Sequence, residues 1–181
     1  MDRTNWPFGK ADINLLVLGV AGRGVAVPLF WTVLDKPGNA DTQERIALME
    51  RCLKVFGATR VSAVLADREV VGEDGFRWLQ KNGMPFHQRL QRNALVPNAW
   101  NRMRRLDDLF GSLKPGQSHR LLGRRPVGGG FVHRSARRVE DGDFLFLVSS
   151  GAPPGEAIDA YADRWPVEIY QPYNLRKTLF D

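Results

Sequence analysis

The sequence has one cysteine, three histidines and no long apolar run. Cys52 has no partner within the chain for a disulfide, which is typical of a protein from a reducing compartment. His87, His119 and His133 are far apart and lack cysteine neighbours, so their spacing does not indicate a zinc site. No apolar stretch approaches the roughly 20 residues of a membrane-spanning helix, and the first residues lack a signal-peptide pattern. We therefore expect a cytoplasmic protein without a membrane partner.

The motifs of several nucleotide-binding classes are also missing. The sequence has no P-loop, no dinucleotide-binding fingerprint and no internal repeat. Its one glycine run, Gly128–Gly130, lies between two short strand patterns and indicates a hairpin turn rather than a phosphate cradle. With 181 residues, of which 43% are hydrophobic and 25% are charged, the chain has the composition of a globular domain that can bury a core.

The positive charge of the chain is concentrated in one block. Residues 87–138 contain 12 Lys and Arg but only two Asp, whereas the rest of the chain contains 14 Lys and Arg and 18 Asp and Glu. This asymmetry indicates a polyanion partner for the block and a separate cation site elsewhere, and its arginines suit bidentate contacts with phosphate. A solvated surface in an arginine-rich proteome is an equally good explanation. The candidate DNA contacts within the block are Arg124, Arg125, Arg137 and Arg138.

A short apolar segment in the middle of the chain is followed directly by three charged residues. Residues 61–66 are mostly small or branched and apolar, which predicts a buried strand. The strand is followed by Asp67, Arg68 and Glu69. In open α/β sheets, ligands bind in the crevice at the carboxyl ends of strands. Asp67 is therefore a candidate functional residue, although it could instead cap the helix that follows.

The remaining pattern predicts further strands and helices. Further strands are expected at residues 13–21, 25–34, 84–90, 120–127, 131–139 and 143–149. Helices are expected from Asp41 or Thr42 to Gly57, from Asp74 to Asn82, and from Pro153 onward. The segments 13–21 and 25–34 are joined by a short glycine-rich connection and should form a β-hairpin. The expected fold class is α/β.

One face of the last expected helix carries both aromatic and charged residues. Tyr161, Arg164, Trp165 and Glu168 stand at i, i+3, i+4 and i+7, a spacing that puts them on one face. Packing through the two aromatic residues is one explanation. It does not account for Arg164 and Glu168, because an arginine and a glutamate on a buried face must pair, bind an ion or face a cleft.

Three motifs of this sequence together resemble a known family. Asp2-Arg3-Thr4-Asn5-Trp6, Ala66-Asp67-Arg68-Glu69 and Tyr161-x-x-Arg164-Trp165-x-x-Glu168 are similar to the three signatures of bacterial insertion-sequence DDE transposases, of the group named after insertion sequence four. The resemblance covers nearly the whole chain up to about Glu168. It implies a ribonuclease-H-like fold, with a five-stranded mixed sheet, flanking helices and a β-rich insertion before the last helix. The expected parts are the core in residues 1–90, the basic β-rich insertion in 91–152, and the last catalytic helix with a divergent tail in 153–181.

The resemblance also implies the site and its partners. Asp2 on the first strand, Asp67 after the fourth strand and Glu168 on the last helix would be the catalytic residues and the ligands of two Mg²⁺ or Mn²⁺ ions. Tyr161 and Arg164 would contact the DNA ends, and Trp165 would pack the helix or stack near DNA. The implied partners are double-stranded DNA, as insertion-sequence ends and target, and a second copy of the chain in the synaptic complex. The implied location is the bacterial nucleoid.

Some positions depart from the family pattern. Leu175 stands where the family has a lysine, Pro166 lies inside the last helix, and the first aspartate is the second residue of the chain. We therefore expect an amino-terminally truncated transposase catalytic domain with little transposition activity. Two alternatives remain open: a non-catalytic remnant that binds DNA or interferes with dimers, and a metal-dependent nuclease of the same fold.

Overall fold

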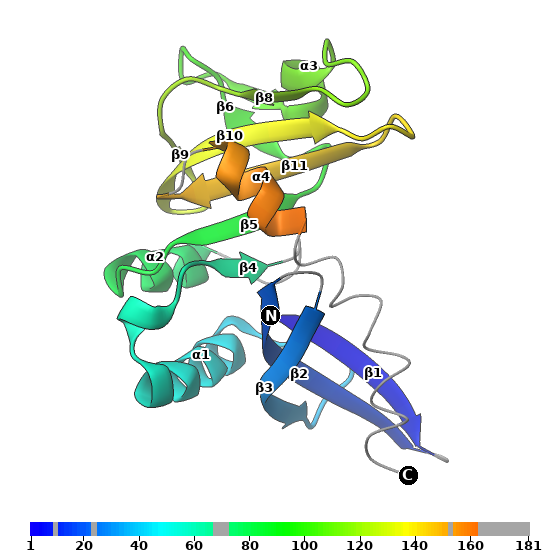
Figure 1. Ribbon diagram of the computed structural model, residues 1–181, viewed down its shortest axis with the longest axis vertical. Helices are drawn as coiled ribbons and strands as arrows, with labels where there is room; N and C mark the ends of the chain where they lie inside the picture. The colour runs from blue at the N-terminus through cyan, green and yellow to red at the C-terminus, as the bar shows by residue number, and fades with distance from the viewer. Residues whose placement is uncertain (9–10, 23–24, 67–72, 152–153, 163–181) are drawn as a thin grey trace.

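The computed structural model describes residues 1–8, 11–22, 25–66, 73–151 and 154–162, which form a mixed α/β structure (Figure 1). The strands are β1 Asp2–Phe8, β2 Ala11–Gly22, β3 Val25–Leu34, β4 Val64–Ala66, β5 Phe86–Leu90, β6 Leu95–Pro97, β7 Met103–Arg105, β8 Ser118–Arg120, β9 Arg125–Val127, β10 Gly130–Arg138 and β11 Phe144–Ser150. The helices are α1 Thr42–Phe56, α2 Glu73–Lys81, α3 Leu106–Phe110 and α4 Pro154–Ala162, with a 3₁₀ turn at Ala58–Arg60. In this part of the chain, no helix is long and apolar enough to cross a membrane.

The first three strands form an antiparallel sheet in the order β1-β2-β3. This confirms the predicted hairpin of residues 13–34. Asn14, Leu16 and Leu18 alternate along β2 and are buried, and the two leucines belong to the core cluster that also contains Met49 of α1. A β-bulge interrupts the pairing of β2 and β3 at Gly19, where an added Cβ would lie only 2.7 Å from a carbonyl oxygen of β3. Only glycine permits this close approach of the two strands.

Helix α1 begins and ends as its sequence predicts. Asp41 is the N-cap, with its side chain accepting a hydrogen bond from the backbone N–H of Glu44 at 2.9 Å. The Glu44 side chain in turn accepts from the N–H of Asp41 at 2.7 Å, which completes a capping box. Gly57 follows the last turn with a φ of +75°, a conformation that favours glycine.

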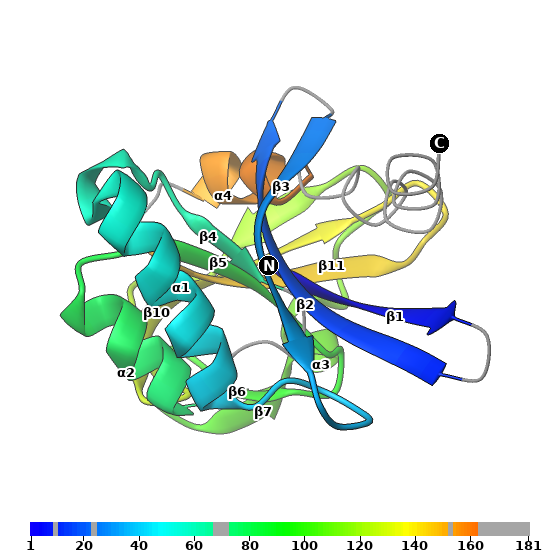
Figure 2. The same ribbon diagram turned by 90° about the horizontal axis from the view of Figure 1, so that it is seen from below.

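The second sheet has six strands and is mixed. Its order is β4-β5-β11-β10-β8, with β9 also paired to β10, and only β4 and β5 are parallel. Helices cover both of its faces (Figures 1 and 2). Phe76 of α2 packs in one core cluster with Val148, whereas α4 packs through Ile158 on Leu147. Since Leu147 and Val148 are successive residues of β11, α2 and α4 lie on opposite faces.

The β-rich part of the chain, residues 91–150, has a core of its own, which consists of Val96, Leu106, Phe110, Ala136 and Phe146. Its turn at Gly128–Gly130 is confirmed, because β9 and β10 pair antiparallel on either side of it. Gly128 has a φ of +55°, and a Cβ there would lie 2.6 Å from the ring of Phe76. The turn therefore packs closely against helix α2.

Several details differ from the expectations. The resemblance predicted one five-stranded mixed sheet, but β1–β3 form a sheet separate from β4 and β5. The described ladders join β4 to β5 but not to β1, and residues 67–72, which follow β4, lie outside the described residues. The predicted strand 120–127 is wrong, because it is split into β8 and β9 by a loop, and β6, β7 and α3 were not predicted. The second sheet includes strands from both sides of the predicted boundary between residues 90 and 91, since β5 pairs with β11, and the division of the chain into parts stays a prediction.

Candidate functional site

The beginning of β1 lies against β4. The α-amino group of Met1 donates a hydrogen bond to the carbonyl oxygen of Leu65, with an N–O distance of 3.0 Å. The side chain of Met1 packs against the main core cluster. Asp2 follows Met1, and Asp67 is two positions after Leu65. The contact therefore joins the residue before Asp2 to β4, the strand that precedes Asp67 in the sequence.

The three predicted metal ligands lie only partly in the described structure. Asp2 is the first residue of β1, as expected, and its backbone pairs with Val17. Asp67 and Glu168 lie outside the described residues. Within the described ranges, no group of three or more His, Cys, Asp or Glu side chains could hold a metal ion. The convergence of the three acids stays a prediction.

Of the four residues predicted to share one face of the last helix, Tyr161 lies within the described structure. Its side chain is 4% exposed and belongs, with Ile158, to a cluster built on Leu147. For Tyr161 the structure thus shows packing between α4 and the sheet, and its predicted contact with DNA stays a prediction. Arg164 and Trp165 lie outside the described residues.

Arg124 directly precedes β9 and Arg125 begins it, and both side chains donate to backbone carbonyl groups of neighbouring segments. Arg124 donates from Nε to the carbonyl oxygen of Phe131 at 3.0 Å. Arg125 donates from Nη2 to the carbonyl oxygen of Ala99 at 3.0 Å. A guanidinium group has five N–H donors in a fixed fork. These contacts use part of that set, so they orient both side chains without excluding a phosphate contact.

Arg137 and Arg138 lie at the other end of β10 and have different surroundings. Nη1 of Arg137 lies 3.7 Å from Oδ1 of Asp159 on α4. Arg138 donates to the carbonyl oxygen of Leu113 at 2.9 Å, and its guanidinium carbon lies 5.2 Å from the ring centroid of Phe144. Successive residues of a strand point to opposite faces. The four predicted DNA-binding arginines therefore do not share one face.

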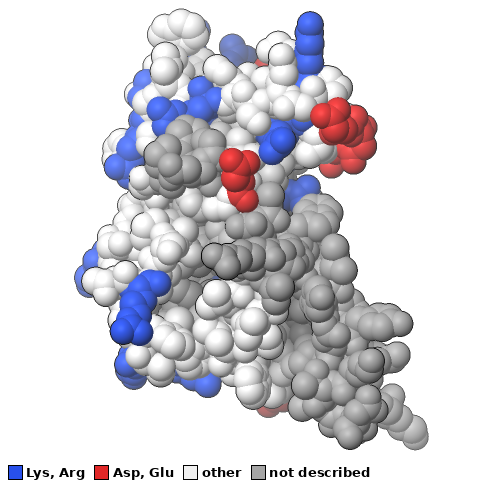
Figure 3. All heavy atoms as spheres, in the orientation of Figure 1, with Lys and Arg blue, Asp and Glu red and all other residues white. Residues whose placement is uncertain are grey.

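Basic side chains gather over the β-rich part of the molecule, which is uppermost in Figure 3. Asp107 is one of the two acids in residues 87–138, and its Oδ2 lies 2.7 Å from Nη2 of Arg105 and 3.6 Å from Nε of Arg92. The hydrogen bond from Arg105 lowers the pKa of Asp107. This carboxylate stays ionised, but it offsets only a small part of the positive charge of the block.

A hairpin of β6 and β7 was missed by the sequence prediction. Its tip is held by Asn98, whose Oδ1 accepts hydrogen bonds from the backbone N–H groups of Trp100 at 2.9 Å and Arg102 at 3.0 Å. Asn101 has a φ of +59°, a conformation that asparagine tolerates. Trp100 is 80% exposed, which is unusual for so large an aromatic side chain. The signal was present in the sequence, since two asparagines flank the tip.

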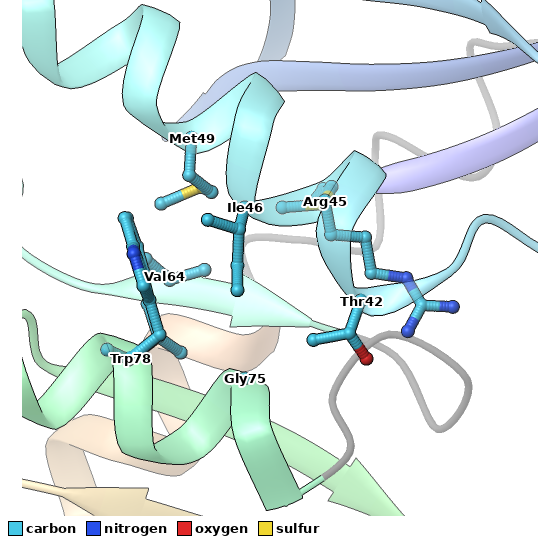
Figure 4. Close-up of a pocket in the computed structure, with 9 residues that line it drawn as sticks. Thr42, Arg45, Ile46, Met49, Val64, Gly75 and Trp78 are labelled. Carbon is cyan, nitrogen blue, oxygen red and sulfur yellow. The ribbon is translucent and has the colours of Figure 1, made fainter.

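An apolar crevice lies between α1, α2 and β4 (Figure 4). Ile46 and Met49 of α1 point toward Trp78 of α2, and Val64 lies behind them, whereas the Arg45 side chain extends away. The side chains that point into the crevice are apolar and provide no group for acid, base or metal chemistry. The crevice is therefore part of the packing of α1 against α2.

No protein-family model matches this chain, and no curated protein matches its sequence. The assignment of a function therefore rests on the three motifs and on the geometry of the described residues.

Proposed function

We propose that this chain is the catalytic domain of a DDE transposase with a ribonuclease-H-like fold. The observation that supports this proposal best is the hydrogen bond from the α-amino group of Met1 to the carbonyl oxygen of Leu65. It makes β1 a neighbour of β4, although the two strands share no ladder. In the proposed fold β1 and β4 belong to one mixed sheet, and this contact supports that arrangement although the described ladders do not join the two sheets.

The chemistry that this proposal requires fits the proposed residues. Carboxylate oxygens are the ligands that Mg²⁺ and Mn²⁺ prefer in proteins. Asp2, Asp67 and Glu168 would hold the metal. When bound, two such ions activate the attacking oxygen and stabilise the leaving oxygen of a phosphodiester. The three negative carboxylates would repel one another. Bound cations would offset this repulsion and so would also stabilise the fold around the site.

The basic β-rich region would bind the DNA substrate. Its arginines provide a positive potential that is independent of DNA sequence, so binding should be strong at low salt and weak at high salt. In this proposal Arg124, Arg125, Arg137 and Arg138 contact phosphates on more than one side of the region, because they do not share a face. A second copy of the chain would complete the synaptic complex.

A second candidate is a non-catalytic transposase remnant that binds DNA without cleaving it. The observation in its favour is Leu175, which stands where the family has a lysine. The two candidates differ only in metal-dependent cleavage, so one experiment distinguishes them.

The test is nicking of supercoiled plasmid DNA in Mg²⁺ or Mn²⁺, with EDTA as the metal-free control. The catalytic proposal predicts metal-dependent nicking that is abolished by Asp2→Asn, Asp67→Asn or Glu168→Gln. Asp141→Asn, which changes an exposed acid in the turn between β10 and β11, should nick at the wild-type rate. DNA binding without nicking would favour the remnant, and nicking that survives all three substitutions would exclude the proposed site.

A further inference from the structure

Arg134 on β10 is a buried arginine without an acidic partner. Its side chain is 0% exposed, and among the described residues no carboxylate lies within salt-bridge distance of it. Burial, and then the nearby charge of Arg125, lower its pKa. A guanidinium group without a counter-charge is costly to bury. We therefore expect the buried guanidinium group to have a function that an apolar side chain of the same size could not perform.

The guanidinium group of Arg134 is held by backbone carbonyl groups of two separate loops. Nη1 donates to the carbonyl oxygen of Pro97, the last residue of β6. Nη2 donates to the carbonyl oxygens of Leu122 and Gly123, each at 3.1 Å, in the loop between β8 and β9. The rigid fork of the guanidinium group allows it to reach both loops at once, which a lysine ammonium group cannot do. Arg134 thus ties the hairpin β6–β7 to the loop before β9.

The two loops present an unusual surface. Trp100 at the hairpin tip is 80% exposed and Leu122 in the other loop is 83% exposed. Exposed arginines accompany them, with Arg102 beside the tip and Arg124 in the loop. A second tie reinforces the first, because Arg125 donates to the carbonyl oxygen of Ala99 in the hairpin. Exposed apolar side chains next to arginines suit a duplex DNA partner, because arginines contact phosphates while apolar side chains contact base edges or insert at a base step.

We propose that Arg134 is the positioning residue of a DNA-binding surface formed by the hairpin β6–β7 and the loop 121–124. It does not contact DNA itself. Its buried guanidinium group holds the two loops in one arrangement before DNA binds, so that the exposed side chains of both loops contact the same DNA segment. This inference rests on the proposed function and adds to it the surface that takes the DNA and the residue that orders that surface.

The test combines amide hydrogen exchange with DNA binding of the full chain. In the wild-type chain, residues 96–105 and 121–125 should be protected, whereas in Arg134→Met both segments should exchange faster. Arg134→Met should also bind duplex DNA about tenfold or more weakly, because the loops must then be ordered at the cost of binding free energy. Trp100→Ala should weaken binding in the wild-type background but have little further effect beside Arg134→Met, since the two act through one surface.

Leu16→Ala is the matched control. Leu16 is buried in the other sheet, so its substitution lowers stability without touching either loop, and DNA affinity should remain that of the wild type. If Arg134→Met does not fold, Arg134→Lys keeps the charge and the buried stem but not the fork, and should show the same faster exchange. A wild-type chain in which the hairpin is unprotected would overturn the inference, as would unchanged DNA affinity in a folded Arg134 variant. A wild-type chain that does not bind DNA would overturn the proposed function, and the exchange data would still decide whether Arg134 positions the loops.

Discussion

His87 on β5 and Ser149 on β11 lie directly opposite each other in the sheet, and both side chains are buried. Ser149 also lies opposite His133 on β10, so the three side chains form one row across three strands. Within the described structure, Nδ1 of each histidine and Oγ of the serine are buried without a hydrogen-bond partner. The row lies on the face that α4 covers, because Leu147 of the same face packs against that helix.

This row predicts that the protein loses stability in mild acid. Burial lowers the pKa of His87 below its ordinary value of 6.5. Burial, and then the charges of Arg120, Arg124 and Arg134, lower that of His133. The unfolded chain therefore takes up protons near pH 6.5 that the folded chain resists, so stability is full above this pH and falls below it. The midpoint of urea unfolding should be lower at about pH 5.5 than at about pH 7.5.

A substitution of His87 tests whether the buried histidines cause the loss of stability in mild acid. His87→Gln should reduce the pH dependence, because it removes a buried group whose pKa is lowered by burial. Asp41 and Asp107 have a pKa below the ordinary 3.8, so their stabilising contacts are lost only in stronger acid. A flat dependence between about pH 7.5 and about pH 5.5 in the wild-type chain would contradict the prediction.

Asn14 provides a second prediction. Its side chain is 5% exposed, and Nδ2 donates to the carbonyl oxygens of Lys36 at 3.0 Å and Gly38 at 2.7 Å. These bonds hold the loop between β3 and α1. Asn14→Leu should lower the free energy of unfolding by about 1–3 kcal/mol, because two carbonyl groups lose their donor. Asn93→Leu, at an exposed turn, should change it little, and equal effects of the two substitutions would argue against this role for Asn14.

The parts of the fold that follow from local pattern could be predicted from the sequence. Helix α1 was predicted because Asp41 and Gly57 mark its ends and apolar residues recur at helical spacing between them. The β2–β3 hairpin was predicted because two apolar runs flank a glycine-rich turn. Both depend on residues close together in sequence, so the pattern contains the necessary information.

The parts that depend on distant contacts could not be predicted. Arg134 is indistinguishable in sequence from the exposed arginines around it, because arginine is normally a surface residue. Its burial depends on the carbonyl group of Pro97, which is 37 residues away along the chain. The described ladders likewise leave β1 unpaired with β4, which is a relationship between strands that lie far apart in the sequence. For the proposed catalytic site, the sequence supplied the three acids and the structure adds the contact of β1 with β4.

Arg137 allows a direct test of the proposed DNA contacts. Its ion pair with Asp159 is long, with the Arg137 side chain partly exposed and that of Asp159 largely exposed, so Arg137→Ala should change stability by less than about 1 kcal/mol. DNA affinity should fall, and the slope of its logarithm against the logarithm of salt concentration should decrease by about one, as expected for one lost phosphate contact. Lys54→Ala on α1 is the control, because it removes an exposed charge far from the basic block. Equal losses for the two substitutions would mean that only net charge matters.

The last prediction concerns stabilisation of the protein by metal. A ligand that binds the folded state alone raises stability in proportion to the logarithm of its concentration. If Asp2, Asp67 and Glu168 converge on divalent cations, Mg²⁺ and Mn²⁺ should raise the melting temperature in the absence of DNA, and Ca²⁺ should show whether other hard cations are accepted. Asp2→Asn should remove this rise. It should also raise the melting temperature of the metal-free chain, because one of three repelling carboxylates is then neutral. Asp141→Asn should retain the wild-type response, because this residue lies in the turn between β10 and β11, remote from the beginning of β1. A metal-induced rise that persists in Asp2→Asn would place the cations elsewhere, whereas the loss of the rise together with a more stable metal-free chain would identify Asp2 as a ligand.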